Sequence, residues 1–156
     1  MKPTRNNHNF QYITFRLARN LIGIDILDIR EIVPCIRVTK VHRAPWFVMG
    51  LMNLRGQILT LLDIGVLLGM EKPGRDSGSH IIVFKHTRVG FAVDQIGDVF
   101  SIDREKLESI PVNIDPRIQQ YTDTIINRPE GVMMLLNAGK ILSCVRTETR
   151  PSKEDL

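Results

Sequence analysis

Residues 46–70, WFVMGLMNLRGQILTLLDIGVLLGM, hold the strongest structural signals in the sequence. Two apolar runs, 48–54 and 57–62, flank Arg55-Gly56, and glycine suits the positive φ angles of a tight hairpin turn. Asp63 can then accept hydrogen bonds from the first amides of a short helix over 64–68, and Gly69 can end that helix in the left-handed conformation. The stretch predicts a β-hairpin followed by one short capped helix.

Toward the N-terminus the same pattern of short strands and turns continues. Residues 10–17 and 22–26 alternate apolar and polar side chains, which predicts two strands joined by a hairpin at Arg19-Asn20. Within 25–33 the isoleucines recur at helical spacing, so we expect a short turn of helix there. Pro34 ends it, because the residue before a proline avoids the helical region.

Toward the C-terminus, short segments again favour β-structure over long helices. Strands are predicted over 80–85, 89–96, 98–102 and 132–136, with a single helical turn over 104–107. Asp103 is a plausible cap for that turn, and Asn137 for a last short helix through Leu142. The polar stretch 71–79 predicts a flexible loop, and 111–127 a loop with at most short strands. Many short strands with Gly and Pro turns imply a barrel or a sandwich.

The composition is that of an ordinary globular protein. Of the 156 residues, 43% are hydrophobic and 24% charged, enough for one domain or two small lobes that share a core. No apolar run approaches the ~18 residues of a membrane span, and the polar first nine residues lack the apolar stretch of a signal peptide. We therefore expect a soluble, cytoplasmic protein.

The net charge of +4 raises the question of an acidic partner. Basic residues gather modestly at Arg16, Arg19, Arg37, Lys40 and Arg43. Aromatic residues make up only 6%, and no run of basic and aromatic residues predicts a base-stacking groove. A solvated, mildly basic face is the favoured interpretation, and the alternative is attraction to an acidic surface of protein or RNA.

Catalytic and metal-binding patterns do not emerge from the sequence. It has neither a phosphate-binding glycine loop nor a GxSxG elbow. The four histidines, His8, His42, His80 and His86, lack metal-ligand spacing. Asp25 and Asp28 are three residues apart, and we interpret them as a helix cap and a surface charge. We predict no catalytic residue, no metal and no cofactor.

Four segments taken together resemble one known family. YITFRL…IGIDILDIREIV (12–33), MGLMNLRGQILTLLDI (49–64), IIVFKHTRVGFAVDQIGDV (81–99) and VMMLLNAGKIL (132–142) are similar, in the same order, to the CheW-like domain of chemotaxis coupling proteins. The most specific element is GLMNLRG (50–56), followed by an apolar strand and Asp63. The resemblance implies one domain over 10–145, with flexible tails at 1–9 and 146–156.

The family resemblance implies a fold and a function. The fold is all-β with a few short helices, built as two SH3-like five-stranded β-barrel lobes around a shared apolar seam. The function is a non-catalytic adaptor that binds the regulatory domain of a CheA-type histidine kinase and the cytoplasmic tip of chemoreceptors. No nucleic acid is expected, and membrane association comes only through receptors. The alternative is a small β-barrel RNA-binding protein, which only the pI near 9.3 favours.

The resemblance also implies two binding regions. The receptor helix would lie in a groove between the lobes, lined at the matching positions Ile29, Glu31, Ile32, Gly50 and Arg55. Glu31 and Arg55 match a carboxylate–guanidinium pair, and Gly50 would let the helix approach closely. The kinase would contact the segment around Asp94, Ile96 and Val99.

Overall fold

The computed structural model describes residues 9–70 and 80–149. The predicted loop 71–79 and the outer parts of the predicted tails, 1–8 and 150–156, lie outside the described residues. Within the described ranges, no helix is both long and apolar enough to cross a lipid bilayer.

Short strands dominate the described chain, as the sequence predicts. The strands are β1 (Asn9–Leu17), β2 (Asn20–Asp25), β3 (Ile29–Pro34), β4 (Val48–Leu54), β5 (Gln57–Asp63), β6 (His80–Phe84), β7 (Val89–Val93), β8 (Gln95–Asp103), β9 (Glu108–Ser109), β10 (Thr122–Arg128) and β11 (Gly131–Leu136). The helices are α1 (Ile64–Leu67), α2 (Pro116–Tyr121) and α3 (Ala138–Thr149), with 3-10 turns η1 (Ile26–Asp28) and η2 (Arg104–Lys106).

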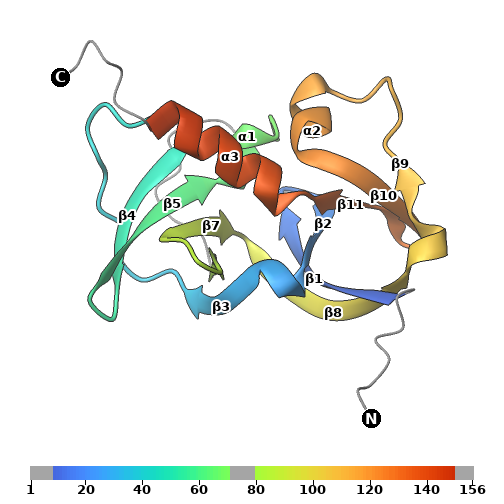
Figure 1. The fold of residues 1–156 in the computed structure, drawn as a ribbon, viewed down its shortest axis with the longest axis horizontal. Helices are drawn as coiled ribbons and strands as arrows, with labels where there is room; N and C mark the ends of the chain where they lie inside the picture. Colours follow the sequence, from blue (N-terminus) through green and yellow to red (C-terminus); the bar gives the residue numbers. More distant parts are fainter. Residues whose placement is uncertain (1–8, 71–79, 150–156) are drawn as a thin grey trace.

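The strands form two sheets, and each sheet builds one lobe (Figure 1). The six-stranded lobe has the order β8-β1-β2-β11-β10-β9, and the five-stranded lobe has the order β3-β6-β7-β5-β4. Each lobe contains one parallel pair, β2 with β11 and β5 with β7. The predicted all-β class with two β lobes is confirmed. One sheet has six strands instead of five, because the two-residue strand β9 pairs with β10.

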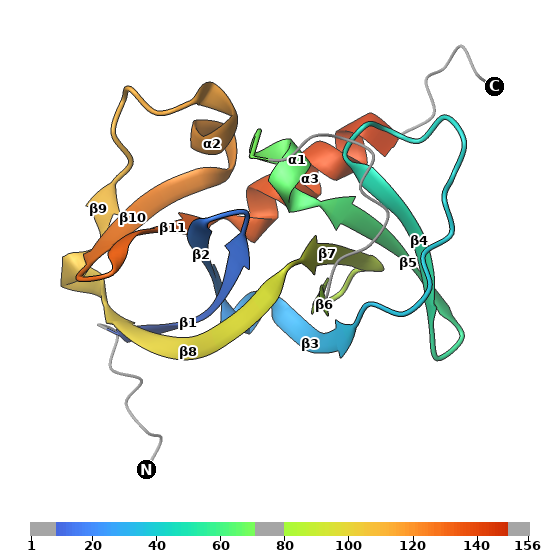
Figure 2. The same cartoon turned by 180° about the vertical axis from the view of Figure 1, so that it is seen from behind.

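The interior of the protein consists of three hydrophobic clusters, one in each lobe and one between the lobes. One cluster, which includes Tyr12 and Met133, fills the six-stranded lobe, and another, which includes Met52 and Leu59, fills the five-stranded lobe. The largest cluster draws side chains from both sheets and from α1 and α3, and these helices lie over the junction of the lobes (Figure 2). This cluster is the predicted apolar seam, which is confirmed.

Strand β6 shows why the seam forms. Its sequence, HIIVF, is almost entirely apolar, because both of its faces are buried. Ile81 and Val83 point into the core of the five-stranded lobe, whereas Ile82 and Phe84 point into the seam. Alternate side chains of one strand thus serve two different cores.

The local signals at the centre of the chain are confirmed. Arg55 and Gly56 have φ angles of +50° and +85°, the pattern of a two-residue hairpin turn between β4 and β5. Asp63 caps α1, since its Oδ1 accepts from the Val66 amide at 3.3 Å. Gly69 follows α1 at φ +72°. In the second half, Asp103 caps the predicted single turn, η2, by accepting from the Glu105 amide.

The helical turn predicted over 25–33 is only partly correct. Ile26–Asp28 form the 3-10 turn, but Ile29–Pro34 form strand β3, paired with β6. A β-bulge between Ile29 and Glu31 inserts one extra residue into this pairing. Ile29 and Ile32 therefore both face the seam although they are three residues apart. The bulge reproduces in a strand the spacing that is typical of a helix.

The loop with at most short strands that is predicted over 111–127 is only partly correct, because residues 111–115 form a loop but a helix follows. The rest of this stretch forms helix α2 and most of strand β10. Asp115 accepts from the Arg117 amide at 2.9 Å, and Pro116 occupies the first helical turn, where its missing N–H is tolerated. Asp115-Pro116 is a typical helix start, but the irregular apolar spacing after it does not indicate a helix.

The last helix is longer than predicted. Asn137 caps α3 through the Lys140 amide, as expected, but the helix continues to Thr149 instead of ending at Leu142. The predicted flexible tail from 146 is therefore helical up to Thr149. Ala138, Ile141 and Val145 are buried in the seam with Leu142 beside them, and these contacts on one helical face explain why the helix continues past Leu142.

Candidate functional site

An exposed ion pair joins the two edges of the five-stranded sheet. Glu31 lies on edge strand β3, and Arg55 lies in the turn that follows the other edge strand, β4. Arg55 Nη2 is 2.5 Å from Glu31 Oε1 and 2.6 Å from Oε2. The Arg55 side chain is 68% exposed and that of Glu31 25%, so the pair faces solvent. Exposed pairs add little to folding, which leaves these charges available to a partner.

The ion pair lies in a shallow basic region, which we call the basic hollow. Its volume is about 440 Å³, and it is lined by Arg30, Glu31, Leu54, Arg55 and Gln57. Arg30 Nη2 is 3.3 Å from Glu31 Oε1, so one carboxylate faces two guanidinium groups. An adjoining hollow shares Arg30 and Gln57 and adds the exposed Arg88. The excess of positive charge suits carboxylate groups on a partner.

The positive charge also acts on Glu31 itself. The hydrogen bond from Arg55 is the main reason that the pKa of the Glu31 carboxyl lies below its ordinary value, and the charges of Arg55 and Arg30 act in the same direction. The Glu31 side chain therefore stays ionised over a wider pH range than an isolated glutamate.

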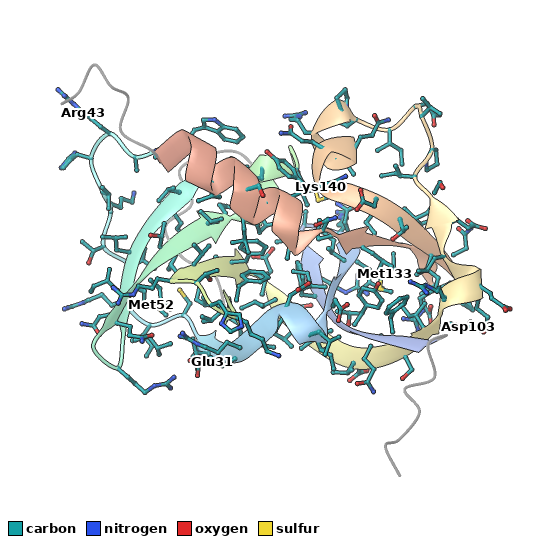
Figure 3. The ribbon with its side chains drawn as sticks, viewed as in Figure 1. Glu31, Arg43, Met52, Asp103, Met133 and Lys140 are labelled. Carbon is teal, nitrogen blue, oxygen red and sulfur yellow. The ribbon has the colours of Figure 1, made fainter. Side chains whose placement is uncertain are left out.

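The other predicted groove residues do not share this surface. Ile29 and Ile32 are half-buried and pack against the seam. The basic hollow is lined only by residues of the five-stranded lobe. Figure 3 shows Glu31 on the lower side of that lobe. The structure thus brings Glu31 and Arg55 together and leaves the two isoleucines behind them, as part of the core.

Gly50 is also separate from the hollow, and its predicted role is corrected. It is buried, has a φ angle of +155°, and lies at the β-bulge between Val48 and Gly50. A Cβ added there would be 2.5 Å from the Thr39 carbonyl oxygen and 2.7 Å from Val38 Cγ1. The space that was predicted to admit a receptor helix is already filled by residues 38–39 of the same chain.

The predicted kinase-contact residues lie along the start of β8, in three different environments. Asp94 Oδ2 accepts from the Ala18 amide at 3.4 Å, and Ile96 packs against the seam. Val99 is 52% exposed, and the partly buried Ile96 also lines the neighbouring pocket. Val99 therefore offers the more exposed apolar contact.

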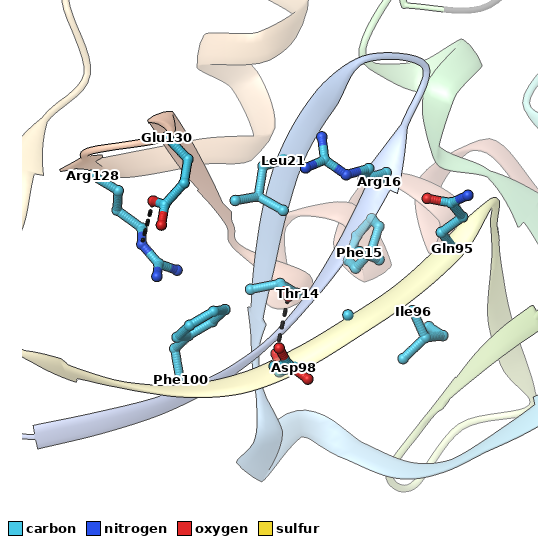
Figure 4. Close-up of a pocket in the computed structure, with 11 residues that line it drawn as sticks. Thr14, Phe15, Arg16, Leu21, Gln95, Ile96, Asp98, Phe100, Arg128 and Glu130 are labelled. Carbon is cyan, nitrogen blue, oxygen red and sulfur yellow. Dashed lines mark hydrogen bonds and ion pairs between the residues drawn. The ribbon is translucent and has the colours of Figure 1, made fainter.

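A pocket of about 220 Å³ opens beside this segment, between β1, β8 and the β10–β11 turn (Figure 4). The Arg128 guanidinium lies 3.7 Å from the centroid of the Phe100 ring, and its Nε is 3.5 Å from Glu130 Oε2. Thr14 donates to the Asp98 carbonyl at 2.9 Å and closes the floor. Arginine stacked on an aromatic ring is common at protein interfaces.

Among the described residues, no group of three or more histidine, cysteine, aspartate or glutamate side chains could hold a metal ion.

Asp25 caps η1 by accepting a hydrogen bond from the Leu27 amide at 2.9 Å, as the sequence predicts. Burial raises the pKa of the Asp28 carboxyl, with a smaller contribution from Asp25.

The model of the CheW-like domain matches residues 11–146, which include strands of both lobes. The chain belongs to the CheW-like domain family. The chemotaxis protein CheW of Klebsiella aerogenes is 30% identical over 135 residues, covering 85% of this chain and 81% of its relative. The chemotaxis protein CheW of Treponema pallidum is 26% identical over 144 residues, covering 88% and 85%. The crystal structure of the scaffolding protein TtCheW from Thermoanaerobacter tengcongensis has a TM-score of 0.71 and 27% identity, and the match covers 82% of this chain and 88% of that one.

Some residues of these surfaces in the CheW-like domain were missed from sequence. Arg30 and Arg88 join the basic hollow and its neighbour although 58 positions separate them, and Arg128 reaches Phe100 from another strand. Of these residues, Arg30 could have been found from the sequence, because it directly precedes Glu31. The others depend on strand pairing that no local pattern indicates.

Replacing Arg55 with glutamine in this CheW-like domain is expected to raise the pKa of Glu31 toward its ordinary value, since the main stabilising hydrogen bond is lost. Because the folded-state pKa is lowered, the pair stabilises the fold above the pH range where glutamate ordinarily titrates. That contribution is lost as pH falls through the lowered pKa. An NMR titration of the Glu31 carboxyl carbon measures this. Lys106→Gln, on the other lobe, is the control, and equal midpoints in wild type and Arg55→Gln would contradict the contact.

Proposed function

We propose that the chain is a non-catalytic chemotaxis adaptor that couples chemoreceptors to a CheA-type histidine kinase. The observation that carries this proposal is the CheW-like match over residues 11–146. The relatives are named chemotaxis proteins, and the similar solved structure is named a scaffolding protein. The RNA-binding alternative is supported only by the basic pI.

A coupling protein needs two separate contact surfaces, and the two lobes offer one each. The basic hollow around Glu31 and Arg55 lies on the five-stranded lobe, and we assign the receptor tip to it. Val99 and the neighbouring pocket lie on the six-stranded lobe, and we assign the kinase regulatory domain to that side. Both partners could then bind at once, in the cytoplasm, with membrane association only through the receptor.

The proposal predicts that two substitutions each weaken binding of a different partner. Arg55→Glu reverses the charge at the basic hollow and is expected to weaken binding of a receptor-tip fragment by about tenfold. Val99→Asp places a carboxylate in the assigned kinase contact and is expected to weaken binding of the kinase regulatory domain by a similar factor. Separate calorimetric titrations of each variant with each fragment measure both effects, and melting curves check that the exposed sites leave folding intact.

The outcome of these titrations decides between the assignments. If each variant loses only its own partner, and if kinase autophosphorylation responds to receptor only when the wild-type chain is present, the coupling role is supported. If wild type binds neither fragment, the coupling function is wrong. If both variants weaken both partners equally, the assignment of one partner to each lobe is wrong.

A further inference from the structure

The long connection between β3 and β4 carries a second exposed surface, far from the basic hollow. Residues 35–47 contain no helix or strand, but a single bridge fixes them to β4. Thr39 and Leu51 exchange two backbone hydrogen bonds of 2.8 Å each. Cys35 and Val38 pack into the core of the five-stranded lobe. The connection is therefore held in place, and the side chains not used for this anchoring are free to face outward.

Those outward side chains combine bulky apolar groups with positive charge. Ile36, Val41 and Trp46 are 79%, 42% and 57% exposed. Arg37, Lys40 and Arg43 are exposed between them, and no aspartate or glutamate occurs between Glu31 and Asp63 in the sequence. Single exposed apolar residues are ordinary, but three of them interleaved with three cations, in a stretch of sequence without acidic residues, form a distinctive surface.

A small pocket opens within this surface. It has a volume of about 150 Å³ and is lined by Lys40, Val41, Trp46, Val48, Met49, Asp63 and Val66. Asp63 is buried and caps α1, so its carboxylate lies at the inner end of an otherwise apolar and cationic lining. The Trp46 ring packs edge-on against the buried Phe47, with centroids 5.4 Å apart, which fixes the indole as a wall. An apolar cavity of about this volume holds a benzene molecule, so the pocket is large enough for one bulky side chain.

We propose that residues 36–46 and this pocket form a docking site for an acidic amphipathic segment of a partner protein. One bulky apolar side chain of that segment enters the pocket between Val41 and Trp46. Its carboxylates face the exposed Arg37, Lys40 and Arg43. The acidic residue that lines the pocket, Asp63, is buried and caps α1. Aromatic and arginine side chains around a desolvated pocket are the usual anchors of such contacts.

The pocket favours a protein segment over other anionic partners. A bilayer presents a broad surface and does not insert a single side chain into a pocket. Single-stranded RNA binds through successive aromatic platforms, whereas Trp46 is the only aromatic residue exposed on this connection. Charge complementarity and concavity together therefore point to an acidic peptide.

This docking site is independent of the proposed coupling function. It lies at the start of β4, whereas Arg55 follows the other end, and a seven-residue strand spans about 20 Å. Figure 3 shows Arg43 and Glu31 at well-separated positions on the five-stranded lobe. A partner could occupy this surface while the basic hollow remains free.

A peptide selection tests the proposal directly. The full chain is used to select from a random-peptide phage library, and the selected peptides are synthesised. We expect a consensus of one aromatic or large aliphatic residue flanked by aspartate and glutamate. Trp46 is the sole tryptophan of the chain, so a peptide without tryptophan should shift its emission to shorter wavelength on binding. Raising the salt concentration should weaken the affinity.

Matched variants locate the contact. Trp46→Ala and the double variant Lys40→Glu/Arg43→Glu are each expected to weaken peptide binding at least tenfold, whereas Lys106→Glu on the six-stranded lobe leaves it unchanged. Arg55→Glu is also expected to leave it unchanged, which separates this site from the proposed receptor contact. Vesicles with 30% phosphatidylglycerol and a uridine 20-mer are titrated in parallel.

Several results would overturn the proposal. One is that no acidic consensus is selected. Another is that the peptides bind equally well to Trp46→Ala while melting curves show both proteins folded. A third is that vesicles or RNA, but not the peptides, bind in a Trp46-dependent way, which would assign the surface to a lipid or nucleic-acid partner.

Discussion

Replacing Gly50 with alanine is expected to destabilise the protein by about 2–6 kcal/mol, as measured by urea unfolding at equilibrium. The φ angle of +155° is strained for any residue with a side chain, which contributes about 1–3 kcal/mol. The new Cβ would also lie 2.5 Å from the Thr39 carbonyl oxygen, and relieving such overpacking costs about 1–3 kcal/mol more. The backbone of residues 38–39 cannot give way easily, because Thr39 is bonded to Leu51.

Gly56→Ala is the matched control for this experiment. Gly56 also has a positive φ angle, +85°, but nothing lies within 4 Å of a Cβ added there. Only the cost of the positive φ angle remains, so we expect the free energy of unfolding to fall by about 1–2 kcal/mol. If Gly50→Ala and Gly56→Ala have the same effect, the close packing of the 38–39 backbone on Gly50 is not important for stability.

Replacing Phe91 with alanine is expected to lower the free energy of unfolding by about 3–5 kcal/mol. Phe91 is fully buried in the seam, and its ring centroid lies 4.1 Å from that of Phe84. The seam is shared, so both lobes should lose stability together in one transition. Trp46 fluorescence follows the five-stranded lobe, and amide hydrogen exchange of β1 and β11 follows the other.

Val112→Ala is the control for the seam. Val112 is 95% exposed, and its truncation should change the free energy of unfolding by less than about 0.5 kcal/mol. Two separate unfolding transitions in Phe91→Ala, with the six-stranded lobe as stable as in wild type, would show that the lobes do not depend on a shared core.

The site residues show where the sequence was informative and where it was not. The pairing of Glu31 with Arg55 came from family resemblance, because a separation of 24 positions carries no local signal. Although β3 and β4 are the opposite edges of one sheet, the sheet curls until its edges meet at this ion pair. The family resemblance predicts that Gly50 lines the receptor groove, and sequence alone cannot show that residues 38–39 cover it.

The sequence by itself determined the features that depend on neighbouring residues. Gly56 supplies a positive φ angle in the β4–β5 turn, Asp63 and Asp103 cap the turns that follow them, and the apolar run HIIVF marks a strand. Each of these needs only a few consecutive residues, because backbone conformation and capping are local interactions.

Only the tertiary structure decided the features that depend on contacts between distant segments. The bulge in β3 places Ile29 and Ile32 on one face, contacts with the seam carry α3 past Leu142 to Val145, and the bridge from Thr39 to Leu51 fixes the β3–β4 connection to β4. In each case an interaction across the fold overrides or extends a weak local preference. The backbone adopts whichever conformation buries its apolar side chains and pairs its amides, and those partners lie far away in the sequence.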